Sequence, residues 1–305
     1  MSDVASKLKV SELDFDAIKS NLKNFLGDQN ELADYNFDGS AMSVLMDLLA
    51  YNTHYNAFYL NMIVNEMFLD TASLRNSVVS RAKHLGYTPT SVRGAKAYVD
   101  LTITPANTPS TIVIEKDTQF NAVVNGISYT FSTSNSTTLN VNSNGVYTTA
   151  NVELQQGITL THRYSANVSD PDQRFILPNA NTDTSSLTVQ IQTSTTSSNL
   201  YTYSVANDTT TINSTANVYF LEEDTDSRYR VYFGDGTTGR ALTSGNIIIL
   251  KSLIADATAP NGARTFTPTS TVGGYSNVTV TTVSAASGGA DRDSISDIKF
   301  NAPRN

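Results

Sequence analysis

Apolar residues recur every three or four positions over residues 1–92, a spacing that predicts helices because it places them on one helical face. The first predicted helix lies in DFDAIKSNLKNFLGD, where Asp14 can cap the start and Gly27 can end it. This is the pattern of an ordinary amphipathic helix. Its apolar stripe consists of Phe15, Ile18, Leu22, Phe25 and Leu26.

A second helix is predicted from Ser40 to about Leu69, a stretch without glycine or proline that would measure roughly 45 Å. Most of its circumference is apolar, interrupted by Asn52 and Asn56, with Glu66 near the far end. We therefore expect it to be buried on several sides. One narrow polar stripe consists of Ser43, Asp47, His54, Asn61 and Asn65. An apolar heptad seam, with alternating steps of four and three, consists of Val44, Leu48, Tyr51, Tyr55, Phe58 and Met62.

A third helix is predicted to begin near Ser73, to end at Gly86 and to be stopped by Pro89. A hairpin of the second and third helices cannot cover the whole apolar surface of the second. We expect the rest of the chain or another chain to help. The residues predicted to face inward are Leu74, Val78, Ala82 and Leu85, and those predicted to face outward are Arg75, Arg81 and Lys83.

From about Ala95 to Val283 the pattern changes to short alternating strands, separated by turn sequences such as VNG, SNG, GDG and PNG. Apolar residues are sparse around residues 135–150, so we place a boundary between two possible subdomains there. The clearest predicted strands are AYVDLTI, STIVI, SYTFSTS, SLTVQIQ, YRVYFG, NIIIL and NVTVTTV.

The C-terminal SAASGGADRDSISDIKFNAPRN contains a Gly-Gly joint, then Ser294 followed by Asp297 in the spacing of a helix cap. The predicted helix stops within about a turn, so we expect the sequence to be part of a longer product. The predicted fold class is α+β, with helices over residues 1–92, a β-rich region of one or two subdomains over 93–285, and a linker with the start of a further helical region over 286–305.

Composition narrows the possible functions. The 305 residues carry a formal charge of −8, which gives no electrostatic basis for binding nucleic acid. The chain has no cysteine, which rules out disulfides, thiolate metal sites and a cysteine nucleophile. Neither a signal peptide nor an apolar run long enough to span a bilayer is present in the sequence, so we predict no membrane partner.

The motif GDGTTG, residues 234–239, matches the glycine spacing of a dinucleotide loop but is followed by a predicted strand, where such a site needs a helix. A glycine-rich turn is the better interpretation. The acidic stretch EEDTDSR, with Glu222, Glu223, Asp224 and Asp226, lacks the glycine and the final glutamate of a calcium loop, so a solvated acidic turn is favoured.

His54, His84 and His162 show no zinc-ligand spacing. The sequence also has no nucleophile elbow and no nucleophile beside an evident base. We therefore predict no catalytic residue, no cofactor and no metal site, and we expect a protein that is not an enzyme.

One long block of the chain reads FDGSAMSVLMDLLAYNTHYNAFYLNMIVNEMFLDTASLRNSVVSRAKHLGYTPTSVRGAKA. Later landmarks are RFILPNANTDTSSLTVQI, VYFGDGTTGRALTSGNIIIL, the Asn261-Gly262 turn and SGGADRDSISDI. Together these segments resemble the baseplate wedge proteins of T-even-type contractile-tailed phages, within the broader baseplate J-like family. The family continues well past the last of these landmarks.

The resemblance implies a structural virion protein of the tail baseplate, assembled in the host cytoplasm. It implies a homodimer with a second copy, whose N-terminal helices bundle with another wedge protein. It also implies a ring of wedges that relays the switch triggering sheath contraction, formed by the C-terminal region that this sequence lacks.

For the protein interface the sequence indicates Tyr51, Tyr55, Phe58, Tyr59 and Met62 on the second helix. Large apolar side chains left in water favour association, so we expect these residues to seal a helical assembly, partly against a partner. The alternative is that they form a purely intramolecular core. For function, the alternatives are a receptor- or carbohydrate-binding tail module, suggested by the Thr- and Asn-rich strands, and a tail-associated glycosidase.

Overall fold

The computed structural model describes residues 14–27, 40–142, 144–170, 172–206 and 212–305. The chain divides into two compact units. The helical unit comprises the described residues up to Tyr87 together with Ser294–Asn305, and the β unit comprises Thr88–Asp293. The α+β fold class predicted from the sequence is confirmed. The division differs from the predicted one because the last helix belongs to the helical unit.

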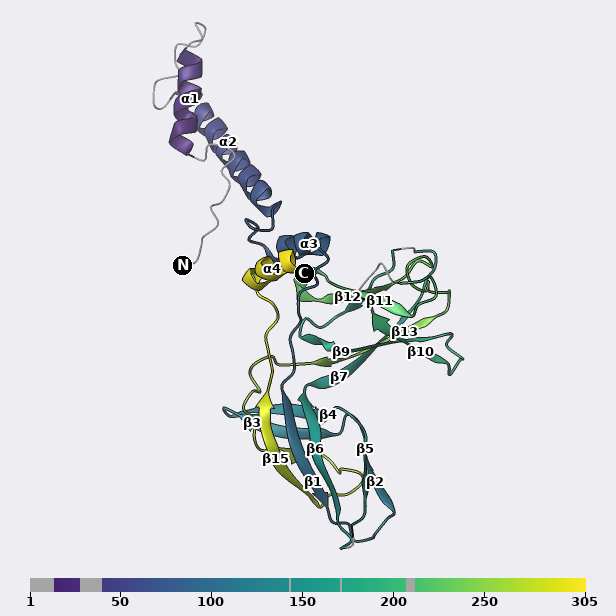
Figure 1. Cartoon of the computed structure of the whole chain (residues 1–305). Helices are drawn as coiled ribbons and strands as arrows, with labels where there is room; N and C mark the ends of the chain where they lie inside the picture. Colours follow the sequence, from purple (N-terminus) through teal and green to yellow (C-terminus); the bar gives the residue numbers. More distant parts are fainter. Residues whose placement is uncertain (1–13, 28–39, 143, 171, 207–211) are drawn as a thin grey trace. The chain divides into compact units, whose positions relative to one another are not determined.

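The helical unit contains two packed pairs of helices (Figure 1). In the first pair, α1 packs on α2, and Asp14 caps α1 by accepting the backbone N–H of Asp16 at 2.9 Å, as predicted. In the second pair, α3 packs on α4, so α3 does not form the predicted hairpin core with α2. The elements are α1 (Phe15–Gly27), α2 (Ala41–Glu66), α3 (Arg75–His84), α4 (Ile295–Asn301) and the short 3-10 helix η2 (Ala302–Arg304).

The core of the second pair brings together segments far apart in the sequence. Two inward positions were predicted wrongly: Leu74 and Leu85 are about half exposed because α3 turns a different face to α4, and Val79 is buried instead. The predicted cap of the last helix is present, since the Ser294 hydroxyl and the Asp297 carboxylate each accept the other residue's backbone N–H. The core residues are Ala72, Val78, Val79, Ala82, Ile298 and Ala302.

The first sheet of the β unit is antiparallel, with the order β14-β3-β4-β6-β1-β15 (Figure 1). Asn125 and Gly126 both have positive φ angles, 50° and 81°, which suits the tight turn between β3 and β4. Its strands are β1 (Lys96–Ile103), β3 (Gln119–Val124), β4 (Ile127–Thr133), β6 (Tyr147–Gln156), β14 (Thr267–Pro268) and β15 (Val278–Ser287), and β2 (Thr111–Ile114) pairs separately with β5 (Thr137–Asn140).

The second sheet has the order β7-β13-β9-β10-β11-β12-β8, in which the β10–β11 pair is parallel. Each sheet has a core of its own: Phe131 and Phe266 meet edge to face in the first, and Tyr203 and Phe233 in the second. The strands are β7 (Ile158–Ser165), β8 (Phe175–Leu177), β9 (Thr182–Gln192), β10 (Leu200–Val205), β11 (Val218–Glu223), β12 (Tyr229–Phe233) and β13 (Ile247–Ile254), with the 3-10 turn η1 (Thr225–Ser227) before β12.

The predicted subdomain boundary at residues 135–150 is wrong. That segment holds the end of β5 and the turn into β6, both within the first part of the β unit. The change of sheet comes at Gly157, between β6 and β7, where φ is 133° and a Cβ would lie 2.6 Å from the Ile254 carbonyl oxygen. The low apolar content therefore marks the connection between β5 and β6 and not a domain boundary.

Buried polar groups join the two sheets. The Asp183 carboxylate, 1% exposed, accepts the backbone N–H of Gly94 at 3.1 Å and the Gln155 amide at 3.2 Å. The Gln156 side chain exchanges two hydrogen bonds with Asp256, at 2.7 and 2.9 Å. Because these groups would be unpaired if the sheets separated, they fix the junction.

Replacement of Gly94 by alanine tests this junction. A Cβ at position 94 would lie 2.3 Å from the Gln156 carbonyl oxygen, so Gly94→Ala should lower the free energy of unfolding by about 2 to 3 kcal/mol. Gly126→Ala is the control, because a Cβ there meets nothing within 4 Å and only its φ of 81° is strained, at about 1 kcal/mol. Urea titration measures both, and equal losses would contradict the steric argument.

Glu66 links α2 to α3 and has a pH-dependent role. Its carboxylate accepts the backbone N–H of Ser73 at 2.8 Å and that of Leu74 at 3.3 Å, at the start of a helix whose N-cap residue supplies no side-chain bond. Burial acts to raise the pKa of Glu66, but hydrogen bonds from Ser73, Ser77 and Leu74 outweigh it, so the pKa lies below its ordinary value.

A carboxylate with a lowered pKa stabilises the fold above its unfolded pKa of about 4.3, and this stability is lost as pH falls through the folded value. We therefore expect amide exchange at Ser73 and Leu74 to accelerate between about pH 5 and pH 3. In Glu66→Gln, exchange should be faster at pH 6 and nearly independent of pH after correction for the intrinsic rate. Glu115→Gln is the control, because the Glu115 side chain has no hydrogen-bond partner among the described residues. An unchanged profile in Glu66→Gln would contradict the assignment.

Candidate protein interface

The long helix α2 begins and ends at identifiable residues. Ser40 lies in extended backbone, and its hydroxyl accepts the backbone N–H of Ser43 at 3.0 Å, a standard N-terminal cap. The helix ends at Glu66, a few residues short of the predicted Leu69, and runs for 26 residues. It is therefore long enough to present several heptads on one face.

The side of α2 that is buried within the chain is its polar stripe. Asn61 and Asn65 are 6% and 8% exposed, because each amide donates to a carbonyl oxygen one turn back in the same helix, at 2.9 and 2.7 Å. The buried residues are Ser43, Met46, Ala50, Ala57, Asn61 and Asn65.

The contacts of α1 lie along this same side. Lys19 on α1 forms an ion pair with Asp47 at 2.5 Å, and Phe15 packs edge to face on His54 with ring centroids 6.5 Å apart. His54, expected to be solvated or hydrogen-bonded, is half-buried in this contact. Within the described residues α2 is buried on one side, because α1 covers mainly the polar stripe.

The apolar heptad seam of α2 faces solvent within the described part of the chain. Its side chains are between 41% and 64% exposed, an unusual state for six large apolar residues in register. The exposed fractions are Val44 64%, Leu48 63%, Tyr51 53%, Tyr55 41%, Phe58 49% and Met62 42%. The structure therefore gives no support to the alternative of an intramolecular core.

The predicted interface residues form an aromatic row along this seam. Tyr51 donates a hydrogen bond from its hydroxyl to that of Tyr55 at 2.9 Å, and the two ring centroids are 4.6 Å apart. Tyr59 contacts Tyr55 at 6.3 Å and Phe58 at 5.9 Å, again between centroids. The hydrogen bond with Tyr51 raises the pKa of the Tyr55 hydroxyl above its ordinary value. These contacts hold the rings in a defined arrangement before any partner binds.

A second apolar strip, which the sequence analysis did not single out, lies beside the seam. Within it Asn56 donates a side-chain hydrogen bond to Asn52 at 2.9 Å, so these amides satisfy each other one turn apart. The exposed residues of the strip are Leu45, Leu49, Leu60 and Ile63. Their three- and four-residue spacing was visible in the sequence, but it could not show which side of the helix α1 covers.

The other candidate motifs have structural explanations. In GDGTTG, Asp235 accepts the backbone N–H groups of Thr237 and Thr238 at 2.8 and 2.9 Å, which closes a tight turn. The segment leads into β13 and not into a helix, so it lacks the helix N-terminus of a dinucleotide site.

The acidic turn at β11 is less solvated than predicted. Arg230 forms ion pairs with Glu222 at 2.9 Å and Asp224 at 3.2 Å, which neutralise part of its charge. No group of three or more metal-ligating side chains forms a potential metal site in the described residues. None of the helices in the same part of the chain meets the length and hydropathy of a membrane span.

Comparisons with known proteins agree with these observations. Residues 14–87 match the model of the baseplate wedge protein gp6-like helical domain. Over 106 residues the chain is 47% identical to baseplate wedge protein gp6 of Enterobacteria phage T4. That alignment covers 35% of this chain and 16% of the relative, so it spans only a small part of the relative's length.

Among solved structures, the chain overlaps with a chain of the anti-feeding prophage (AFP) baseplate, solved by cryo-EM with 6-fold symmetry. The overlap covers 94% of this chain and 51% of the other, with 14% sequence identity and a TM-score of 0.31, which is too low to argue a shared fold. The two sequence matches confirm the predicted resemblance: the N-terminal helical part of this chain is similar to that of baseplate wedge proteins.

Proposed function

We propose that the chain is a scaffold subunit of a contractile-tail baseplate wedge and that the α2 seam is the surface through which it joins its neighbours. The observation that carries this proposal is the exposure of all six seam residues while the polar stripe of the same helix is buried. A structural role in a baseplate is supported by the matches to wedge proteins. Assembly through α2 is the further step proposed here.

The spacing of the seam specifies the partner. Steps of four and three residues place a continuous apolar row against another helix, because knobs from one helix enter holes on the other only at this spacing. Each large side chain removed from water contributes about 1.5 to 3 kcal/mol, so several together offset the entropy of association. The partner surface is therefore a helix with its own apolar seam.

The strip beside the seam, with Leu45, Leu49, Leu60 and Ile63, widens the apolar surface beyond what one helix covers. We propose that α2 packs against more than one helix, from a second copy of this chain and from another wedge protein. This fits the homodimer and the mixed bundle that the family resemblance implies. We assign the protein to the virion tail baseplate, after assembly in the host cytoplasm.

A role in relaying the switch that triggers sheath contraction rests on the family resemblance alone. The helical and β units have separate cores, and rigid-body movement of such units is one known form of conformational switch. We propose no catalytic step, because the relatives that the chain matches are described as baseplate wedge proteins.

Charge placed in the seam tests the assembly. Tyr55→Asp combined with Phe58→Asp should abolish co-purification with the partner wedge proteins, because two carboxylates would be buried unpaired in the helix interface. Both side chains are largely exposed in the isolated chain, so the far-UV circular dichroism of the variant should be unchanged. Size-exclusion chromatography with light scattering measures the assembly.

The matched control is Val123→Asp combined with Ile127→Asp, on the β3–β4 hairpin, where the two side chains are 64% and 57% exposed. This control adds the same charge to exposed apolar residues outside α2 and should assemble normally. Normal assembly of the seam variant would refute the proposal. Loss of assembly in both variants would show an effect of charge and not of the seam.

A further inference from the structure

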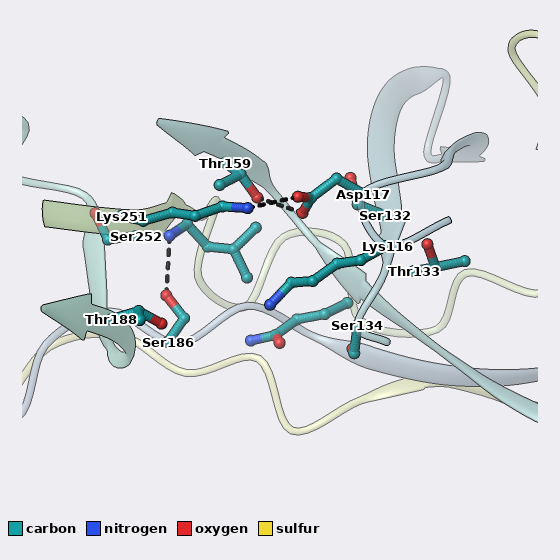
Figure 2. A pocket seen from close by; sticks show the side chains of 12 residues that line it. Lys116, Asp117, Ser132, Thr133, Ser134, Thr159, Ser186, Thr188, Lys251 and Ser252 are labelled. Carbon is teal, nitrogen blue, oxygen red and sulfur yellow. Dashed lines mark hydrogen bonds and ion pairs between the residues drawn. The ribbon is translucent and has the colours of Figure 1, made fainter. Parts of the chain in front are cut away.

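A polar pocket lies in the β unit, at the junction of its two sheets (Figure 2). Its volume is about 120 Å³, well above the roughly 10 to 15 Å³ that one water molecule needs. One wall comes from the turn after β2, with Lys116 and Asp117, and from the end of β4. The opposite wall comes from β9, with Ser186 and Thr188, and from β13, with Lys251. A group bound here would touch both sheets.

The two lysines of the pocket differ in their partners. Lys251 forms an ion pair with Asp117 at 2.8 Å, and Thr159 donates to the other oxygen of the same carboxylate at 2.8 Å. Lys116 extends into the pocket toward the side on which Ser186 and Thr188 lie (Figure 2). Its ammonium group has no hydrogen bond or ion pair among the described residues. One positive charge in the pocket is therefore uncompensated by direct contact.

Several hydroxyl groups around the pocket already donate hydrogen bonds within the chain. Ser132 and Thr133 donate to the backbone carbonyls of Gly157 and Glu115, and Ser134 donates to the Glu153 carboxylate at 2.8 Å. Asp183, behind the wall, is satisfied by the donors of the sheet junction. The hydrogen-bond donors that remain available to a ligand are the ammonium of Lys116, further N–H groups of Lys251 and the hydroxyl of Thr188. The Thr188 hydroxyl has no partner among the described residues.

We propose that this pocket binds a compact oxyanion, a carboxylate or a phosphate, held between the ammonium groups of Lys116 and Lys251 and the hydroxyl of Thr188. Charge-assisted hydrogen bonds from ammonium groups to oxyanions are the strong polar contacts in proteins. The small volume excludes an extended ligand, and the absence of aromatic rings among the lining residues argues against a sugar. Binding would bridge the two sheets and stiffen their junction.

Titration of the full chain with inorganic phosphate, and separately with acetate, tests the site. We expect saturable NMR shifts confined to the amides of residues 115–118, 186–188 and 251–253, with affinity in the millimolar range, about 1 to 10 mM. Saturation by phosphate alone indicates a free tetrahedral anion as the source, and saturation by acetate indicates a carboxylate group. Sodium chloride at matched ionic strength controls for screening. Shifts with neither anion, or shifts equal to those with chloride, would overturn the proposal.

Lys116→Met should weaken binding about tenfold or more, because it removes a charged donor and no existing contact. Thr188→Val should weaken it less, since it removes one neutral donor. Arg163→Gln is the matched charge control: Arg163 is exposed on β7, outside the pocket, and the variant should bind as the original chain does. Thermal unfolding in the absence of anion checks that each variant is folded. Unchanged affinity in Lys116→Met, or equal weakening in Arg163→Gln, would refute the site.

Discussion

The burial of apolar surface on α2 is the constraint on which the function of this protein depends. A helix of 26 residues with large apolar side chains on most of its circumference needs several neighbours to exclude water from it. The described part of the chain supplies one such neighbour, α1. This helix packs on the polar side of α2, where the exclusion of water contributes the least free energy. The exposed apolar surface is therefore a property of the isolated chain, and its burial is the driving force of the assembly proposed here.

The buried polar stripe shows how the chain leaves the seam free. Asn61 and Asn65 each donate a hydrogen bond to a carbonyl oxygen of their own helix, and Asp47 forms an ion pair with Lys19 on α1. Two small residues, Ala50 and Ala57, are buried on the same side. The contact with α1 therefore buries polar groups that are paired, which keeps their desolvation penalty small. The large apolar side chains, whose burial would contribute the most free energy, stay exposed on the other side of the helix.

The β unit has apolar cores of its own. Each sheet has a core of aromatic and branched side chains, and the junction between the sheets is held by buried polar groups around Asp183, Gln155 and Gln156. These cores form without any residue of the α2 seam. The junction also gives the proposed oxyanion a role, because Lys116, on the turn between β2 and β3, and Lys251, on β13, lie on opposite walls of the pocket and a shared ligand would join them.

The sequence by itself determined the helices, most of the strands, the turn at Asn125-Gly126, the cap at Ser294 and the apolar seam, because these depend on local propensity and on the periodicity of side chains. It also carried the resemblance to wedge proteins. It could not determine which side of α2 is buried. The sequence pattern shows a polar face and an apolar face, but only the position of α1 in the structure shows which of them is covered. The pairing of α3 with α4 and the change of sheet at Gly157 were likewise decided by tertiary structure, because both depend on segments distant in sequence meeting in space. The pocket belongs to the same class: Lys116, Thr188 and Lys251 carry no common motif, and the folding of two sheets against each other is what brings them together.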